Sequence, residues 1–376
     1  MTNKTALTLT QAYNKQLSGT WPTQWYIPIG LYSWGFNGNG NLGLGNTTNY
    51  SSPKQIGALT TWSKIAAGYD HNIAVKTDGT MWSWGQNFYG ALGLGNTTNR
   101  SSPVQVGALT TWSSIVANSF NGSIAIKTDG TIWSWGYNNN GELGLGNTTD
   151  RSSPVQIGAL STWSSISGGR FRSHAIKTDG TLWSWGSNNH GRLGLGNTTN
   201  YSSPKQIGAL TTWLSISAGN YHSIAIKTDG TLWTWGQNSY GQLGQGDTTS
   251  RSSPVQIGAL TTWLKIAGGI YHSMAIKTDG TLWTWGQNSH GQLGLSDTIR
   301  RSSPVQIGAL TNWLNIAAAY HSMAIKTDGT MWSWGLNQDG QLGVGDTTAK
   351  SSPVQVGALT NWLNVSAGNN HSLAIG

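Results

Sequence analysis

The sequence predicts an all-β fold, a seven-bladed β-propeller with four-stranded blades, on three observations. The dipeptide Trp-Gly recurs at spacings of 50, 51, 50, 50, 50 and 49 residues. Each interval holds short segments rich in β-forming residues and turn signals, without a helical pattern, which is typical of propeller blades. The two ends of the chain carry complementary parts of one repeat. The Trp-Gly tryptophans are Trp34, Trp84, Trp135, Trp185, Trp235, Trp285 and Trp334.

One repeat, residues 211–260, illustrates the four strands expected in every blade. Its second segment places Ile224 and Ile226 on one face, at the period of two that a strand requires. Asp229-Gly230 then predicts a tight hairpin, because glycine takes the positive φ such a turn demands. Pro254 is expected at the start of the fourth strand, where proline is tolerated. The predicted strands are 213–219, 222–227, 232–236 and 254–258.

The chain ends predict how the ring closes. The first repeat begins at Gly30 without its first two strands, and the last repeat stops at Gly376 before the hairpin turn. Segments 31–59 and 362–375 would therefore share the seventh blade. This closure removes exposed sheet edges, whereas a solenoid would need polar capping repeats at both ends. The predicted domains are an N-terminal arm over 1–29, a possible docking segment, and a propeller over 30–376.

Composition narrows the partners and the packing. The chain has 52 Gly and 22 Trp, only 9% charged residues, a formal net charge of +8 and no Cys. Its positive charge is dispersed, which disfavours a nucleic-acid partner. No classical signal peptide and no membrane span is predicted. Because tryptophans recur at matching positions in every blade, we expect them to pack between blades rather than to stack on ligands.

The polar residues predict no catalytic, cofactor-binding or metal site. Of 13 acidic residues, six belong to the hairpin turn and three more replace a repeated asparagine, so turn and cap roles are expected. Asp70, Glu142, Asp150 and Asp339 occur in single blades and form no isolated pair. One repeat position is expected to make a structural hydrogen bond; it is held by His71, Asn121, Arg172, His222, His272, His321 and His371.

The repeat resembles a known family. Residues 216–226 followed by 229–244 (Asp-Gly-Thr-Leu-Trp-x-Trp-Gly-x-Asn-x-x-Gly-Gln-Leu-Gly) are similar to the regulator of chromosome condensation repeat, and the match covers about residues 30 to 376. The resemblance implies a seven-bladed propeller closed by shared strands. It does not imply one function, because the family includes a nucleotide-exchange factor that binds nucleosomes and an ultraviolet-B photoreceptor.

Specificity on a repeated frame must come from positions that differ between blades. These positions follow Trp-Gly and precede the His position, and their Tyr-, Asn- and Ser-rich chemistry is similar to that of antibody loops. The segment 170–172 differs most from the repeat. The predicted partner-binding residues are Arg170, Phe171, Arg172, Phe88, Tyr89, Tyr240 and His290.

The expected function is a non-catalytic protein-binding or structural scaffold within a larger assembly. Near-identical repeats, low charge and the N-terminal arm favour a structural, decoration or attachment component of a bacteriophage particle, so the expected location is the virion, with the cytoplasm as the alternative. A glycan-binding, lectin-like propeller that uses Trp and Asn on one rim is a second hypothesis. An intracellular nucleotide-exchange or chromatin-binding regulator is a third.

Overall fold

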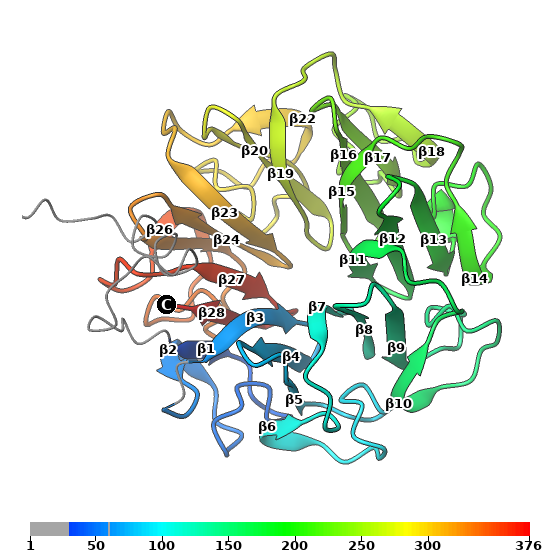
Figure 1. Cartoon of the computed structure of the whole chain (residues 1–376). Coiled ribbons are helices and arrows are strands. Elements are labelled where there is room, and N and C mark those ends of the chain that lie inside the picture. The colour runs from blue at the N-terminus through cyan, green and yellow to red at the C-terminus, as the bar shows by residue number, and fades with distance from the viewer. Residues whose placement is uncertain (1–29, 59–60) are drawn as a thin grey trace, which may run out of the picture.

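The computed structural model describes residues 30–58 and 61–376, and the predicted arm over 1–29 lies outside this part. Seven four-stranded antiparallel sheets are arranged in a ring, which confirms the predicted propeller (Figure 1). In the described ranges the one helical element is a single 3-10 turn, Asn189–Gly191. No helix found there is long and apolar enough to cross a membrane.

Each blade contributes one strand to the inside of the ring, where neighbouring inner strands contact one another (Figure 1). The inner strands are β3 (Trp62–Ala67), β7 (Trp112–Ala117), β11 (Trp163–Gly169), β15 (Trp213–Ala218), β19 (Trp263–Gly268), β23 (Trp313–Ala318) and β27 (Asn364–Ala367). The second strands are β4 (His71–Lys76), β8 (Gly122–Lys127), β12 (Arg172–Lys177), β16 (His222–Lys227), β20 (His272–Lys277), β24 (His321–Lys326) and β28 (His371–Ile375).

The third strands carry the Trp-Gly dipeptide and the fourth strands form the outer edge of each blade. The third strands are β1 (Leu31–Gly35), β5 (Met81–Gly85), β9 (Ile132–Gly136), β13 (Leu182–Gly186), β17 (Leu232–Gly236), β21 (Leu282–Gly286) and β25 (Met331–Gly335). The fourth strands are β2 (Tyr50–Gln55), β6 (Arg100–Gln105), β10 (Arg151–Gln156), β14 (Tyr201–Gln206), β18 (Arg251–Gln256), β22 (Arg301–Gln306) and β26 (Lys350–Gln355).

The first and last strands of the ring share one blade, as predicted. Its strand order is β2-β1-β28-β27, and β1 pairs with β28 over its full length, from Leu31 opposite Ile375 to Gly35 opposite His371. The ring is therefore closed by hydrogen bonds between strands far apart in the sequence. We call this the closure blade, or blade 1, and number the others 2 to 7 along the chain.

The outer strands begin earlier than predicted. β18 starts at Arg251, so Pro254 lies inside the strand and not at its start. The pairing of β18 with β17 shifts between Thr234 and Gly236, which marks a bulge. An edge strand with a bulge needs no hydrogen bond from the proline nitrogen, and it therefore accepts Pro254.

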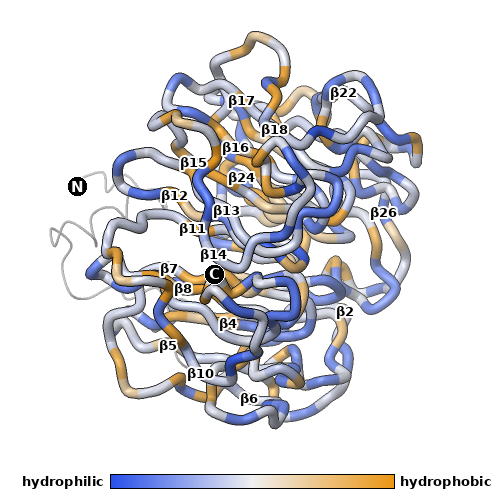
Figure 2. The backbone as a smooth tube through the Cα atoms, turned by 90° about the vertical axis from the view of Figure 1, so that its right-hand side faces the viewer, coloured by the Kyte–Doolittle hydropathy of each residue, from blue (hydrophilic) through white to orange (hydrophobic). Residues whose placement is uncertain are grey.

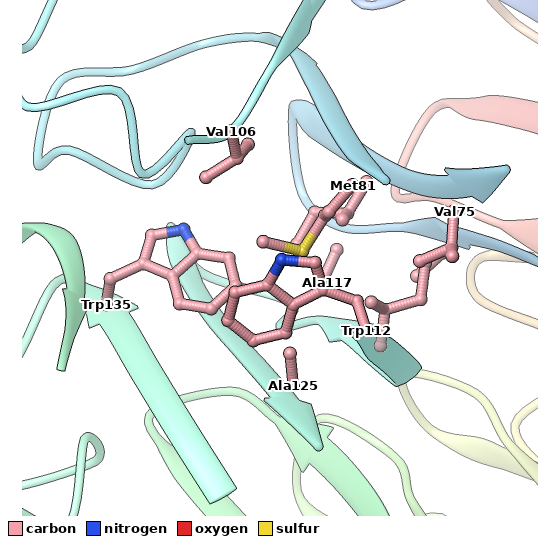
Figure 3. Packing of buried hydrophobic residues seen from close by; sticks show 10 residues of the cluster. Val75, Met81, Val106, Trp112, Ala117, Ala125 and Trp135 are labelled. Carbon is pink, nitrogen blue, oxygen red and sulfur yellow. The ribbon is translucent and has the colours of Figure 1, made fainter. Parts of the chain in front are cut away.

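The core lies between blades, and each hydrophobic cluster joins two of them. One cluster combines Val75 and Met81 of blade 2 with Trp112 and Trp135 of blade 3 (Figure 3). Hydrophobic stretches follow the strand interiors, for instance near β8 and β16 (Figure 2). All seven Trp-Gly indoles are fully buried, and each donates its Nε1–H to a backbone carbonyl of the preceding blade, as Trp235 does to Arg192 at 3.0 Å. The expected inter-blade role of these tryptophans is confirmed.

Candidate partner-binding surface

The two faces of the ring are built from different connections. At one face, which we call the loop face, the loop between the inner and second strands meets the long loop that follows Trp-Gly, because His71 pairs with Gly85. Gly236 at this junction has φ +105°, and a Cβ there would lie 2.7 Å from the Tyr221 carbonyl oxygen, so only glycine fits. The opposite face, the hairpin face, carries the Asp-Gly turns.

Six of the seven inner loops place an aromatic side chain at the centre of the loop face. Each ring belongs to the residue before the second strand or one residue further away, and all six side chains are at least partly exposed. Blade 1 is the exception, because Asn369 and Asn370 occupy its inner loop. We call the set the aromatic arc: Tyr69, Phe120, Phe171, Tyr221, Tyr271 and Tyr320.

Rings of the arc contact one another in two groups, one of three rings in blades 2 to 4 and one of two rings in blades 5 and 6. The Phe120 centroid lies 6.0 Å from that of Tyr69 and 4.5 Å from that of Phe171. Tyr221 and Tyr271 stack with centroids 4.8 Å apart and an interplanar angle of 8°. Such pairs contribute about 0.5–1.5 kcal/mol beyond their buried area. The arc thus contains two groups of packed rings assembled from separate loops.

Two arginines hold the middle of the arc. The Arg170 guanidinium lies 5.1 Å from the Phe171 centroid and 5.6 Å from that of Tyr221, and it also donates a hydrogen bond to the Tyr221 hydroxyl. The Arg192 guanidinium lies 5.5 Å from the same Tyr221 ring. Burial lowers the pKa of Arg192 to about 10, which leaves it charged at neutral pH. The arc therefore combines aromatic faces with two cations.

The structure brings most of the predicted partner-binding residues to this face. Arg170 and Phe171 belong to the arc, and Tyr89 and Tyr240 extend it outward, with centroids 6.5 Å from Phe120 and 5.0 Å from Tyr271. Phe88 is 61% exposed and His290 is also exposed, each in the loop after Trp-Gly of its own blade.

Arg172 is not available to a partner. Its side chain is fully buried, and its Nη2 donates to the carbonyl oxygens of Gly219, at 2.9 Å, and His222, at 2.5 Å, in the next blade. The sequence suggested a surface residue because Arg172 stands next to Arg170 and Phe171. Alternation along β12 instead turns its side chain into the interface between blades 4 and 5.

Sequence reasoning did not select Tyr137 or Arg192 for this surface. Tyr137 follows Trp-Gly directly, and its ring lies 5.2 Å from Phe120 and 4.8 Å from Tyr89. Arg192 occupies a position that holds other polar residues or alanine in the remaining blades, so its contact with Tyr221 leaves no local pattern. The sequence does contain one signal for the arc as a whole: an aromatic residue stands just before the His position in six of the seven blades.

Histidines connect the blades below the arc, and the expected structural role is confirmed. The Nε2 atoms of His222, His272 and His321 each lie 2.8 Å from the Oγ of a serine in the next blade. His371 closes the ring with an Nε2 to Asn72 Oδ1 distance of 2.7 Å. Burial lowers the pKa of these three histidines and of His371 to about 3, so the imidazoles are neutral and poorly suited to proton transfer at neutral pH.

Two blades depart from the histidine pattern. In blade 3 the position opposite the Trp-Gly glycine is Gly122, not Asn121 as predicted, because the extra loop residue shifts the register by one. In blade 4 Arg172 takes that position, and His174 supplies the imidazole instead, with its Nε2 2.9 Å from Ser223 Oγ.

Models of known protein families match this repeat over most of the chain. A family model described as the regulator of chromosome condensation (RCC1) repeat matches residues 30–75, 78–119, 129–176 and 179–226, and a model of the RCC1-like domain matches residues 208–374. This chain belongs to the RCC1 repeat family. A relative from Arabidopsis thaliana, the ultraviolet-B receptor UVR8, is 32% identical over 130 residues, which are 34% of this chain and 30% of the receptor. The match thus spans less than a third of that receptor.

Solved structures of RCC1-type propellers share the whole fold. Yeast RCC1 (Prp20), in a crystal structure with Kap60, superposes with a TM-score of 0.82 and 21% identity, covering 93% of this chain and 89% of that one. Human WBSCR16 superposes with a TM-score of 0.83 and 20% identity, covering 93% and 98%. At these identities the likeness shows the fold alone.

The acidic residues of this RCC1 propeller act mainly in turns. Asp229, like the other hairpin aspartates, accepts hydrogen bonds from the backbone and hydroxyl of Thr231, at 2.9 and 2.6 Å. Burial raises the pKa of Glu142 to about 7, and that of Asp70 also rises. Across residues 30–58 and 61–376, no group of three or more His, Cys, Asp or Glu side chains that could hold a metal ion is found.

The basic residues before Ser-Ser-Pro are largely neutralised in blades 5 to 7. Arg251, Arg301 and Lys350 each pair with an aspartate four residues earlier, at 2.6, 2.6 and 2.8 Å. These three cations are therefore paired surface charges, and such ion pairs contribute about 0–1 kcal/mol each.

Proposed function

We propose that this chain is a non-catalytic protein-binding propeller whose partner docks on the aromatic arc of the loop face. The observation that carries the proposal is the convergence of three aromatic rings from three blades, Phe120, Phe171 and Tyr221, around Arg170 and Arg192. Tyr and Arg are among the residues enriched at interaction hot spots. Because the rings already pack against one another, little side-chain entropy is lost when a partner covers them.

The relatives support protein binding as the general role of such propellers. The solved structures of yeast Prp20 concern a complex with Kap60 and binding to Gsp1p and histones. Those partners belong to the yeast protein and are not transferred here. The aromatic ring of the arc repeats in six blades of this chain, whereas Arg170 and Arg192 each occur in one blade only, so we expect the partner to be set by these two arginines.

The glycan-binding alternative receives less support from the tryptophans. The half-exposed indoles two residues before the Trp-Gly tryptophan are the ones that face solvent, yet a lysine covers each of them. The Nζ of Lys227 lies 3.5 Å from the Trp233 centroid, and Lys76 lies 3.7 Å from Trp82. A sugar ring that stacked there would first displace this cation–π contact.

We further propose that the partner belongs to a larger assembly, with a bacteriophage particle as the leading setting. Near-identical blades and a low charged fraction of 9% support a component that repeats within a particle. Mass spectrometry of purified particles should detect this chain at a fixed ratio to the main structural protein. Its exclusive recovery in the soluble cell fraction would contradict this setting.

Replacing Arg170 and Phe171 by Ala is expected to weaken attachment to the native partner at least tenfold, about 1.4 kcal/mol. The double variant removes the guanidinium and one ring from the middle of the arc while the core stays intact, so its melting temperature should change by only a few degrees. Binding is measured by quantitative pull-down from the native source.

The matched control is Tyr201→Ala with Lys205→Ala, which removes another cation–aromatic pair, 5.6 Å apart, from the outer strand β14. This control should bind normally. Equal binding by both double variants and the unmodified chain would refute the arc as the docking surface.

Screening with generic ester, glycoside and nucleotide substrates is expected to return background rates, because the polar residues act in turns and between blades. Asp70 is held by the amides of Asn41 and Asn39, at 3.0 and 3.4 Å. Turnover that is abolished by Asp70→Asn or Asp339→Asn, with folding retained, would establish an enzyme instead.

A further inference from the structure

Each inner strand β3 to β23 begins at the hairpin face with a bulge, and the extra residue of that bulge differs between two halves of the ring. In β15, Trp213 pairs with Lys227 and Ser215 with Ile226, so Leu214 is the extra residue. Blades 2 to 4 have serine there, and Ser63 Oγ donates to the Val75 carbonyl at 2.9 Å. The serines are Ser63, Ser113 and Ser164, and the leucines are Leu214, Leu264 and Leu314.

The leucines of the bulges lie in solvent, beside further exposed leucines. Leu214, Leu264 and Leu314 are 58%, 52% and 39% exposed. The connection that leads into each of these strands adds one more leucine, about half exposed, and blade 1 continues the series with Leu363. We call this surface the leucine crescent: Leu210, Leu214, Leu260, Leu264, Leu310 and Leu314. Blades 3 and 4 keep only the connection leucines Leu109 and Leu160.

Single exposed leucines are ordinary, but a run of them on adjacent blades marks a contact surface. The inner strands β15, β19, β23 and β27 are neighbours in the ring, so the crescent is continuous along one side of the channel mouth. A serine at the bulge, as in blades 2 to 4, fits the same backbone conformation and donates a hydrogen bond to a carbonyl oxygen of the second strand. Leucine there makes no side-chain hydrogen bond and leaves 39–58% of the residue exposed, which points to an external apolar segment.

The chain enters the propeller at one end of this crescent. The Gly30 N–H donates to the Gly376 carbonyl at 2.8 Å, and the Leu363 N–H donates to the Ile375 carbonyl at 2.8 Å. Gly30 is therefore held in blade 1, on the hairpin face, and β27 of this blade contacts β23, which carries Leu314. The point at which the chain enters the propeller therefore lies in the blade next to that of Leu314.

The composition of the preceding segment complements that surface. Residues 21–29 contain five large apolar side chains, Trp21, Trp25, Tyr26, Ile27 and Ile29. Residues 1–29 contain no acid and two lysines, whereas the hairpin tips present exposed aspartates such as Asp229 and Asp279. The lysines of these hairpins stack on their own tryptophans. Nine extended residues span about 30 Å, enough to cross neighbouring blades.

We propose that residues 21–29 pack on the leucine crescent of their own propeller. The segment runs from blade 1 toward blades 7 and 6, away from the serine-bearing blades, and places its aromatic side chains over Leu314 and Leu264. This assignment goes beyond the proposed function, since it concerns the opposite face and leaves the aromatic arc free for a partner.

Engineered disulfides test the assignment cleanly, because the chain has no cysteine. Leu314 and Ser63 occupy the same bulge position in the two blades that flank blade 1, so they are matched targets. Tyr26→Cys with Leu314→Cys should form an intramolecular disulfide at least tenfold faster than Tyr26→Cys with Ser63→Cys. Intact mass and non-reducing electrophoresis give the yield. Equal rates, or mainly disulfide-linked dimers, would overturn the proposal.

Proteolysis provides an independent measurement without new cysteines. Chymotrypsin cleavage after Trp25 and Tyr26 should be slow in the unmodified chain and at least tenfold faster in Leu264→Ser with Leu314→Ser, which copies the residue of blades 2 to 4. The control Leu109→Ser with Leu160→Ser removes two exposed leucines outside the crescent and should leave the rate unchanged. Fast cleavage in the unmodified chain, or the same rate in both variants, contradicts the assignment.

Discussion

Deleting residues 362–376 is expected to abolish cooperative folding of the propeller. The deletion removes β27 and β28, leaves β1 and β2 as an unsupported pair, and exposes the edge of β1 that pairs with β28. It also removes Trp362, Val365, Leu373 and Ile375 from two inter-blade clusters. At about 1.5–3 kcal/mol for each buried side chain, the loss is about 6–12 kcal/mol, comparable to the whole stability of a typical domain.

A point variant tests the same closure in a protein that still folds. Trp362→Ala should lower the free energy of unfolding by about 3–5 kcal/mol. Leu359→Ala, in the connection just before it and 46% exposed, should change it by less than about 0.5 kcal/mol. Thermal melting and size-exclusion chromatography report both changes. A truncated chain that melts like the intact one would show that the ring is not closed through blade 1.

Acidification from pH 7 to pH 4.5 is expected to unfold the protein, because the buried imidazoles must stay neutral. Burial lowers the pKa of His71 to about 4 and that of His222, His272, His321 and His371 to about 3. The histidines of the unfolded chain bind protons near pH 6.5, whereas those of the folded chain do not. The free energy of unfolding therefore decreases as the pH falls below that value. Five histidines destabilise the fold by up to about 7 kcal/mol per pH unit.

The titration of the carboxyl groups does not reverse the destabilisation that the histidines cause on acidification. Burial raises the pKa of Glu142 to about 7, so its protonation favours the folded state between pH 7 and 4.5, and the raised pKa of Asp70 acts in the same direction. Burial also raises the pKa of Asp339, so three carboxyl groups oppose at least five imidazoles. The hairpin aspartates, whose pKa values are lowered by the hydrogen bonds from threonine, add destabilisation only at lower pH.

Melting curves recorded between pH 8 and 4.5 measure the effect. His321→Gln should reduce the slope of stability against pH by about 1.4 kcal/mol per unit, since one titrating group is removed. Leu359→Ala, which removes no titrating group, should leave the slope unchanged. A melting temperature that stays constant from pH 7 to pH 5 would show that the imidazoles are not held neutral by the fold.

The sequence predicts the blades because the same local pattern is repeated seven times. Trp-Gly, Asp-Gly and the alternation around Ile224 each depend on neighbours within a few residues. The start of β18 was missed for the same reason, since the register shift opposite Thr234 depends on the pairing of two strands.

The surface could be predicted less well because its contacts join different blades. Arg170 and Phe171 were found as departures from the repeat, but the contact of Arg192 with Tyr221 bridges residues 29 positions apart. Arg172 looked equivalent to Arg170, and only the neighbouring blade shows that its guanidinium has three backbone acceptors. The site residue Gly122 was missed because a one-residue insertion can be placed at several points of a loop.

The shared blade also sets a timetable for the chain during synthesis. β1 is made early, but its partner β28 follows roughly 340 residues later, which at about 5–20 residues per second is about 17–68 s. Blades 2 to 7 are each complete within one repeat and can pair their own strands as they emerge. β1 therefore remains unpaired along one edge while the six other blades fold. Each of those blades already has its four strands, so none of them offers β1 a competing partner.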